Sequence, residues 1–482
     1  MLLINYIYNL LYQALLLIIP LIIAPFLART LGATGIGIYG YVNSTTVLIY
    51  SIITLGIYNY GNRQIAYVRD DKEKLSETFW RIITVRIIML IIGTIVYFGT
   101  VFIEGRYKTY FFIYYTFFAA YFLDCTWLFT GVEDMKWAVL KNTFTKVLAT
   151  VLIFLFIRNP DDTWKYILIQ GGSTLIANLT AYTQIQRYVG KPQLIFTGIP
   201  KAIKGSVILF LPGIASSLYT QCDKIMIELM TNKSALVSQY EYAEKLVSVP
   251  MAFILVMSTV LMPRMANEYI RGNRSRISDI LNSTSKISVM LAMPLMFGMI
   301  AITPKLIPWY LGEEFTLTMN AIILISPTII TQTMLGISGS QYFTATNQVK
   351  VLLKAQIPAA LGNLVINAIL IPRIGMTGAA IATTISSITC AFIQYYYLLK
   401  QIRLPGLAKC YVKYFGMSAV MLLTIRIFTK NAKANPVTTI TQIIIGVTVY
   451  FLICLLVKDE QFMFALNKVV QIFRRSINKK PN

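Results

Sequence analysis

The chain has 482 residues, of which 56% are hydrophobic and only 13% are charged, and its mean hydropathy is +0.64. One soluble core cannot bury that much apolar surface, so the composition excludes an ordinary soluble enzyme and predicts a membrane protein with many spans. A net charge of +23 would suggest nucleic acid in a soluble protein. Basic loops on one side of a membrane give the same excess, so we expect no nucleic-acid partner.

Apolar segments of about 20 residues recur along the chain, which is the length that a helix needs to cross roughly 30 Å of hydrocarbon. They predict an all-α polytopic membrane protein with about fourteen transmembrane helices, the first of them an uncleaved span. The expected limits are 6–28, 37–60, 82–102, 111–130, 143–157, 166–186, 205–230, 243–262, 286–303, 318–340, 353–371, 377–399, 413–429 and 439–457.

Lys and Arg gather in alternate loops, for example in 61–81 and 263–286. Loops rich in these residues stay on the cytoplasmic side, so we expect both termini in the cytoplasm. The last segment, 458–482, places apolar and basic residues on different sides of a helix, which predicts a basic amphipathic tail bound to anionic membrane lipids. A frayed basic tail is the alternative.

Two parts of the chain resemble each other. Tyr39 and Tyr240 each begin a Tyr-x-Tyr pair before or at the start of a span, and Arg63 and Arg264 follow at the same spacing. Six spans followed by six related spans are a common transporter plan, with the binding site where the repeats meet. The predicted domains are an N-terminal six-helix lobe (1–190), a C-terminal six-helix lobe (205–400), two additional helices (413–457) and the tail.

Polar residues line one face of several spans at i, i+3 and i+4 spacing. Asn5, Asn9 and Gln13 form such a stripe in the first span, and Asn363 and Asn367 lie on another in the eleventh. Ser and Thr stripes favour hydrogen bonds between helices, whereas the Asn-rich stripes favour a hydrated central cavity.

Charged residues inside spans are functional candidates, because an ion at the centre of the bilayer costs at least about 2.5–3.5 kcal/mol. Asp124 is the clearest, because its side chain is too short to reach an interface. The other candidates are Arg29, Arg86, Lys146, Asp223, Lys224, Glu241 and Glu244. The cations among them could instead extend to an interface, and Glu241 could simply neutralise Lys245 one turn away.

The chain shows no sign of enzymatic chemistry. It has no histidine, its five cysteines lack metal or disulfide spacing, and GxxxxGK[ST], GxSxG and HExxH are all absent from the sequence. We therefore expect no catalytic residue, no metal site, no cofactor and no ATP hydrolysis.

A family resemblance follows from several motifs. ARTLGATGIGIYGYVNS (28–44), in the expected first external loop, is similar to the signature of polysaccharide-unit (Wzx-type) flippases of the multidrug/oligosaccharidyl-lipid/polysaccharide exporter superfamily. Leu128 departs from the family, which often has an aromatic residue there. Further similar positions are Gly61, Arg63, Ala66, Asp124, Trp127, Gly131, Glu133, Asp223, Lys224, Tyr240, Ala243 and Glu244.

The resemblance implies two six-helix lobes around a central cavity and alternating access. The implied activity is export of an undecaprenyl-diphosphate-linked oligosaccharide repeat unit across the bacterial cytoplasmic membrane for capsule or exopolysaccharide synthesis. Other membrane proteins of polysaccharide assembly are then candidate partners.

Each candidate residue has an expected role in that hypothesis. Arg29, Arg86, Lys146 and Lys224 would attract the diphosphate, and Asn5, Asn9 and Gln13 would contact sugar hydroxyls. Asp124, Asp223, Glu241 or Glu244 would bind H⁺ or Na⁺ as the coupling ion. The alternatives are a peptidoglycan-precursor flippase and a cation-coupled multidrug exporter. A membrane polymerase is disfavoured, because the longest expected external loop, 304–317, is short.

Overall fold

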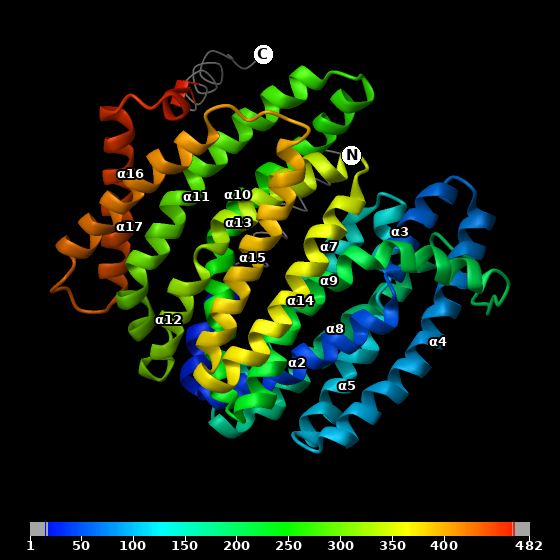
Figure 1. The fold of residues 1–482 in the computed structure, drawn as a ribbon. Helices are drawn as coiled ribbons and strands as arrows, with labels where there is room; N and C mark the ends of the chain where they lie inside the picture. The colour runs from blue at the N-terminus through cyan, green and yellow to red at the C-terminus, as the bar shows by residue number, and fades with distance from the viewer. Residues whose placement is uncertain (1–14, 16–17, 465, 468–482) are drawn as a thin grey trace, which may run out of the picture. The chain divides into compact units, whose positions relative to one another are not determined.

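The computed structural model describes residues 15, 18–464, 466 and 467, and no strand occurs among them (Figure 1). A helix over Ile18–Thr30 precedes the labelled elements. These are α2 (Gly32–Thr54), α3 (Ile57–Val68), α4 (Lys72–Glu104), α5 (Lys108–Phe122), α6 (Thr126–Gly131), α7 (Met135–Phe156), η1 (Pro160–Asp162), α8 (Thr163–Ile185), α9 (Ile199–Thr231), α10 (Ser234–Ile270), α11 (Arg274–Tyr310), η2 (Glu313–Phe315), α12 (Thr316–Ile325), α13 (Thr328–Leu335), the π-helical η3 (Gly336–Thr344), α14 (Val349–Ile374), α15 (Met376–Leu399), α16 (Leu407–Phe428) and α17 (Pro436–Leu456).

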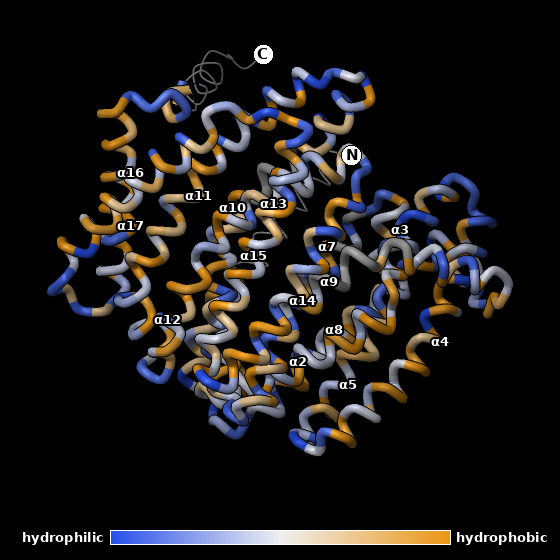
Figure 2. The backbone as a smooth tube through the Cα atoms, in the orientation of Figure 1, coloured by the Kyte–Doolittle hydropathy of each residue, from blue (hydrophilic) through white to orange (hydrophobic). Residues whose placement is uncertain are grey.

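Within the described residues, nine helices are long and apolar enough to cross a membrane, or ten if Glu313–Ile325 and Thr328–Thr344, bent by 45°, form one span. Apolar side chains such as Ile95 (71% exposed) and Val447 (51%) project from them, as lipid-facing residues do. Figure 2 shows the apolar middle sections and the hydrophilic ends of these helices. The all-α polytopic class is confirmed, whereas the number fourteen stays a prediction.

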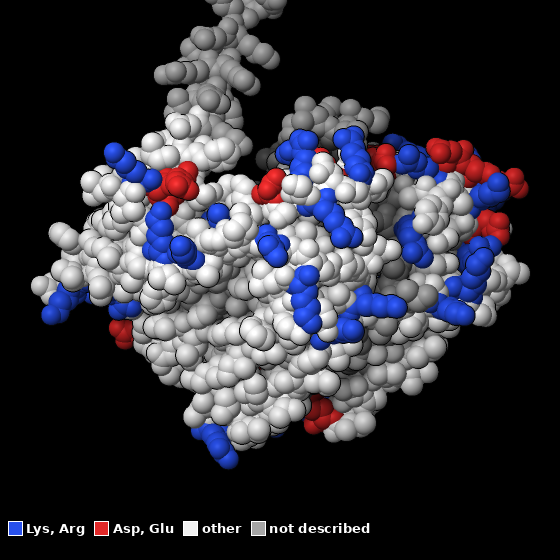
Figure 3. All heavy atoms as spheres, turned by 45° about the horizontal axis from the view of Figure 1, so that its top comes forward, with Lys and Arg blue, Asp and Glu red and all other residues white. Residues whose placement is uncertain are grey.

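Basic residues lie mainly at the ends of helices. Figure 3 shows Lys and Arg side chains gathered over the helix ends that are turned toward the viewer. This distribution is the one expected from alternate basic loops, although the direction in which the termini face stays a prediction.

The expected external loop at 28–44 is wrong, because these residues are helical apart from a turn at Leu31. The glycines in this stretch serve close packing. A Cβ at Gly37 would collide with the backbone of Ser234, and one at Gly40 would meet the Glu241 carboxylate. Small residues that let helices approach closely are typical of membrane bundles, so glycine here indicates contact between helices and not a loop.

Two predicted spans are interrupted. The second, 37–60, breaks at Leu55 and Gly56, which both adopt left-handed backbone angles (φ 47° and 73°). A Cβ on Gly56 would lie only 3.1 Å from the Phe210 backbone, so glycine suits this turn. The fourth, 111–130, breaks between α5 and α6. Non-helical backbone inside a membrane needs hydrogen-bond partners from the protein, and these define the candidate site below.

Contacts divide the chain into two packing units. The first unit comprises Met1–Glu241 and Asn367–Gly375, and the second comprises Tyr242–Ile366 and Met376–Asn482. In the first, α9 packs on α2, α3 and α4, and in the second, α11 packs on α16 and α17. The predicted lobe limits of 1–190 and 205–400 stay predictions.

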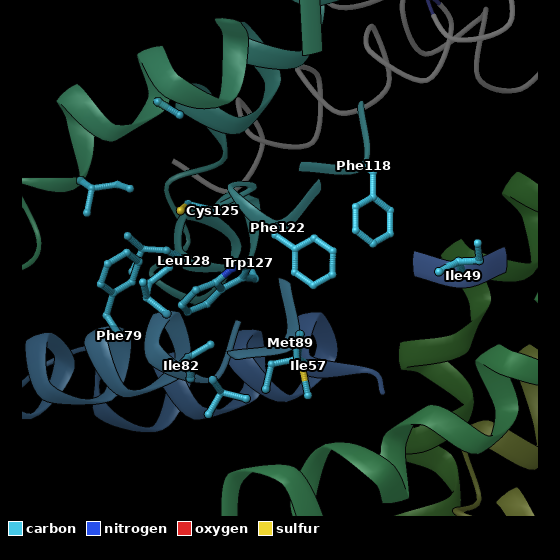
Figure 4. Close-up of a cluster of buried hydrophobic side chains, with 14 of the residues drawn as sticks. Ile49, Ile57, Phe79, Ile82, Met89, Phe118, Phe122, Cys125, Trp127 and Leu128 are labelled. Atoms are coloured by element: carbon cyan, nitrogen blue, oxygen red, sulfur yellow. The ribbon is translucent and has the colours of Figure 1, made fainter. Parts of the chain in front are cut away.

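The first unit has an aromatic core (Figure 4). Trp127 is fully buried and stacks on Phe79 at 5.3 Å between ring centroids. A Cβ on Gly61 would lie 2.8 Å from its indole, and one on Gly131 would lie 2.7 Å from Ile65. These three motif residues therefore hold α3 against α6, which gives the motif a packing role.

Candidate functional site

The break between α5 and α6 gathers charged side chains inside the first unit. Because α5 ends at Phe122, its last carbonyl groups have few backbone partners: the Tyr121 carbonyl accepts one 3.3 Å backbone bond from the Asp124 N–H, and no backbone bond to the Phe122 carbonyl is seen among the described residues. Arg86, in the middle of α4 and 1% exposed, supplies donors to two of them. Its Nε donates to the Phe122 carbonyl at 2.9 Å, and its Nη2 donates to that of Tyr121. A cation is also the favourable charge at the negative end of a helix dipole.

Asp124 lies in the break itself and is held from two directions. Its Oδ1 accepts hydrogen bonds from the Thr126 backbone N–H (3.2 Å) and hydroxyl (2.6 Å), which begin α6. It also accepts from Lys141 Nζ on α7 at 2.5 Å. The Lys141 side chain is 6% exposed and that of Asp124 is 20% exposed. This pair therefore joins α6 to α7 at the point where the span is interrupted.

Asn178 of α8 completes the arrangement. Its Oδ1 accepts from Lys141 Nζ at 2.8 Å, and its Nδ2 donates to the Ala120 carbonyl at 2.6 Å. We call Arg86, Asp124, Lys141 and Asn178 the helix-break cluster. It contains two cations and one carboxylate, so its formal charge is positive. Positive charge buried in a membrane protein attracts an anionic group such as a phosphate.

Lys141 was missed by sequence reasoning because it was placed in a loop before the expected span at 143–157. The structure extends that helix back to Met135, which carries Lys141 into the bundle. A partial signal existed: a carboxylate inside a span favours a buried cation as partner, and Lys136 and Lys141 are the first two cations downstream of Asp124.

A second group of contacts surrounds Asp223, which is completely buried on α9. Its Oδ2 accepts from the Tyr240 hydroxyl at 2.5 Å, and its Oδ1 accepts from Asn367 Nδ2 at 2.5 Å. We call these three residues the Asp223 cluster. It joins α9, α10 and α14 across 144 positions of sequence. Both of these donors are neutral side chains.

A third carboxylate, Glu228, is also completely buried on α9. Its Oε1 accepts from Arg106 Nη1 at 3.3 Å and from the Tyr107 hydroxyl at 3.1 Å. The Tyr107 hydroxyl also lies 2.7 Å from that of Ser234. Glu228 was not predicted, because it lies at the end of the seventh span, where an acidic residue is expected to be solvated.

The remaining candidates are spread over the chain. Glu241 is buried against Gly40, whereas Glu244 is half-buried in the second unit. Arg29 and Lys146 are exposed, and Lys224 is half-buried. The roles of all these residues stay predictions. Asn5, Asn9 and Gln13 lie outside the described residues.

Comparison with known proteins locates the chain among glycan transporters. The model of the family described as "Polysaccharide biosynthesis protein" matches residues 2–268. The chain is 22% identical over 370 residues to the "Putative O-antigen transporter" of Escherichia coli K12, covering 75% of this chain and 88% of that protein. It is 25% identical over 186 residues to the "Probable low-salt glycan biosynthesis flippase Agl15" of Haloferax volcanii, covering 39% of each.

Solved structures share the fold. "Lipid II flippase MurJ, inward closed conformation" matches with a TM-score of 0.73 and 17% identity, covering 95% of this chain and 99% of that chain. An inward-facing multidrug resistance MATE family transporter of the MOP superfamily matches with a TM-score of 0.64 and 14% identity, covering 84% and 96%. The chain therefore shares the all-α polytopic fold of these two structures, whereas the two six-helix lobes stay a prediction.

Proposed function

Because this chain belongs to the polysaccharide biosynthesis protein family, we propose that it is a flippase that moves a lipid-linked glycan across a membrane. The relatives named as an O-antigen transporter and as a glycan biosynthesis flippase support this class of substrate. In finer terms, the cargo is an undecaprenyl-diphosphate-linked oligosaccharide repeat unit for capsule or exopolysaccharide. It is exported across the bacterial cytoplasmic membrane by a protein with both termini inside.

The Asp223 cluster is the observation that carries the transport mechanism. Asp223 is a fully buried carboxylate whose oxygens accept hydrogen bonds from Tyr240 and Asn367, and an ionised carboxylate inside a membrane bundle is costly to maintain. Binding of H⁺ or Na⁺ at Asp223 would offset that cost. Because the three residues come from three helices, gain or loss of the cation changes the contact between those helices. This is the coupling that alternating access needs.

The energetics of such a cycle are adequate. One positive charge that moves inward down a membrane potential of 100 mV supplies about 2.3 kcal/mol. The glycan and diphosphate would cross through the polar interior while the lipid tail stays in the bilayer. Arg29, Lys146 and Lys224 are the cations proposed to meet the diphosphate. Arg86, also a candidate, binds the end of α5 through Nε and Nη2 and keeps only Nη1 for a further acceptor. The cycle needs no catalytic residue and no cofactor.

Two partner predictions accompany the proposal. The basic tail at 458–482 would bind anionic lipids, although residues 468–482 lie outside the described part of the chain. Other membrane proteins of polysaccharide assembly would receive the exported unit.

The proposal is tested by deleting the gene in its native host and analysing membrane lipids by mass spectrometry, with growth recorded alongside. We expect a polyprenyl diphosphate that carries several sugars to accumulate while surface polysaccharide is lost, and a plasmid copy to reverse both effects. Accumulation of the peptidoglycan precursor with growth arrest would instead assign the chain to that substrate. An unchanged lipid pool with new drug sensitivity would assign it to drug export.

A further inference from the structure

A cavity of about 250 Å³ opens on the first unit beside the helix-break cluster. It lies between α4, the end of α5 and α8, and its wall includes Ile87, Leu90, Leu123, Leu179 and Tyr182 together with Arg86. Ile87 on α4 and Leu179 on α8 line it and are 42% and 52% exposed. The helix α4 is long and apolar enough to cross a membrane, and α8 coincides with the span expected at 166–186. The cavity is therefore open to lipid, and its volume is below the roughly 300–1,000 Å³ of sites for drug-sized ligands.

One charged side chain interrupts this largely apolar wall. Arg86 has five N–H donors, and its Nε and Nη2 bind the α5 carbonyls. Its Nη1 is buried and has no hydrogen-bond partner within 3.5 Å among the described residues. The Tyr50 phenol of α2 is a further neighbour, close enough to the guanidinium for an electrostatic and a hydrogen-bonding interaction. A guanidinium with an unused donor at the base of an apolar cavity favours an acceptor that enters with the ligand.

The local charge indicates which acceptor fits. Asp124 is the carboxylate of the helix-break cluster, and Lys141 already holds it at 2.5 Å. Arg86 is bound instead by neutral carbonyl groups, so its positive charge has no contacting carboxylate to offset it within this cluster. A buried guanidinium without a contacting carboxylate is stabilised by an anionic ligand. A phosphate suits this position, because its oxygens match the geometry of the guanidinium N–H donors.

Depth in the membrane agrees with a lipid phosphate. The apolar part of α4 was expected to begin at residue 82, which places Arg86 about 6 Å inside it along the helix axis. Arg86 therefore lies about one helical turn from the end of the span, near the level of the headgroups, where lipid phosphates are found. Leu90 lies one helical turn deeper in the hydrocarbon.

We propose that this cavity binds one anionic glycerophospholipid of the surrounding bilayer. Its phosphate accepts a hydrogen bond from Arg86 Nη1, and the start of one acyl chain packs on Leu90, Leu123 and Leu179. The lipid would stabilise the break between α5 and α6 through Arg86. This inference does not depend on the transport proposal, because it concerns a resident lipid and is measured on the isolated protein.

The test is lipid retention by the purified full chain. The protein is incubated with phosphatidylglycerol or phosphatidylcholine of equal chain length, stripped with detergent, and analysed by native mass spectrometry. We expect one phosphatidylglycerol to be retained per chain, with a preference over phosphatidylcholine of roughly tenfold, as for one charge-assisted hydrogen bond. Leu179→Trp fills the mouth of the cavity and should abolish retention.

Leu168→Trp is the matched control. Leu168 is also an exposed α8 residue (43%), but it lies about 16 Å from position 179 along the helix and does not line the cavity. This variant should retain phosphatidylglycerol as the unmodified protein does. Arg86→Gln should lose the preference for the anionic lipid. Because Arg86→Gln also weakens the cap on α5, the melting temperature of this variant is recorded. The comparison of Leu179→Trp with Leu168→Trp tests the site even if Arg86→Gln does not fold.

Three outcomes would overturn the inference. Retention by Leu179→Trp equal to that of the unmodified chain would show that the lipid binds elsewhere. Equal retention of the two phospholipids by the unmodified chain would remove the role of Arg86. Displacement of phosphatidylglycerol by an added polyprenyl diphosphate would assign the cavity to the transported lipid instead.

Discussion

The two packing units differ in the chemistry of their interiors, although both are helical and both face lipid. The first unit buries full charges. Arg86, Asp223, Glu228 and Glu241 are at most 5% exposed, and the Lys141 side chain is 6% exposed. Removing each of these charged groups from water costs several kcal/mol even after the protein has relaxed, and this cost is offset by pairing and hydrogen bonds.

The second unit buries contacts between neutral groups along its spans. The Thr331 and Ser387 hydroxyls lie 2.5 Å apart, and the Ser338 hydroxyl donates to Gln394 Oε1 at 2.8 Å. Its buried carboxylates Glu268 and Asp459 lie near helix ends: Glu268 is two residues from the end of α10, and Asp459, which pairs with Lys413 of α16, lies beyond α17. Neutral hydrogen bonds in membrane bundles average about 0.6 kcal/mol and are less costly to break and re-form.

This difference indicates that residues that contact the substrate or the coupling ion should be sought first among the buried charged residues of the first unit. Charge in a low-dielectric interior interacts strongly with a diphosphate or a cation, whereas hydroxyl and amide pairs chiefly hold helices together. The comparison therefore predicts that changes to charged residues of the first unit affect function or folding strongly. Changes to neutral pairs of the second unit should have small effects.

Lys141→Met should give the largest effect on stability. It leaves Asp124 at the helix break without its cation, which costs about 3–5 kcal/mol for a buried pair. Unfolding of the purified protein by heat and by denaturant measures the loss. The double change Asp124→Asn with Lys141→Met should recover at least half of it, because no unpaired charge then remains. Equal stability of the single variant and the unmodified chain would show that the pair contributes only packing.

Asp223→Asn should reduce transport at least tenfold, since an amide cannot bind a proton or Na⁺ as a carboxylate does. The measurement is export of the lipid-linked glycan by deletion cells that express the variant, with protein amount matched. Asn is nearly isosteric, so the melting temperature should change little. Normal transport by this variant would remove Asp223 from the coupling mechanism and move attention to Glu241 or Glu244.

Lowering the pH should protonate Asp459 in the second unit and weaken its ion pair with Lys413 and its hydrogen bonds with Tyr414 and the Phe462 N–H. Burial raises the pKa of Asp459, but hydrogen bonds from Lys413, the Phe462 N–H and Tyr414 outweigh burial, so the net pKa is lowered. A carboxyl group with a lowered pKa stabilises the fold fully above its unfolded value, near 3.9, and loses that effect as pH falls through the folded value. Hydrogen exchange at the start of α16 should therefore accelerate below about pH 4.

Asp459→Asn is the control for that measurement. It should make exchange at α16 faster at neutral pH and remove the additional acceleration in acid. If the variant and the unmodified chain respond to acid alike, other carboxylates are responsible.

Ser387→Ala should have the smallest effect. It removes a neutral hydrogen bond to Thr331, for which about 0.6 kcal/mol is typical in a membrane bundle. Transport by the variant should stay within twofold of normal in the same cell assay. A tenfold loss would show that the second unit also carries function in its neutral pairs, and the contrast between the units would fail.

Particular elements show how far the sequence could be interpreted. The expected spans at 377–399 and 439–457 coincide closely with α15 and α17. A long uninterrupted apolar segment in a bilayer forms a helix, because only a helix pairs all of its backbone groups internally. The stretch at 28–44 was misinterpreted, because glycine that permits turns and glycine that permits close helix packing look the same in a single sequence. Asp124 and Asp223 were identified as unusual, but their partners Lys141 and Asn367 were not assigned to them.

Hydropathy and the pattern of charge in the sequence were enough to predict an all-α polytopic membrane protein, and its motifs indicated the family. These properties depend on composition and on local order along the chain. The cap of Arg86 on α5, the Lys141–Asp124 pair, and the hydrogen bonds of Tyr240 and Asn367 to Asp223 became visible only in the packed helices. Such contacts join helices that are far apart in the chain. They depend on how those helices pack, and packing is set by the side chains of several helices together, so no single segment of the sequence predicts it.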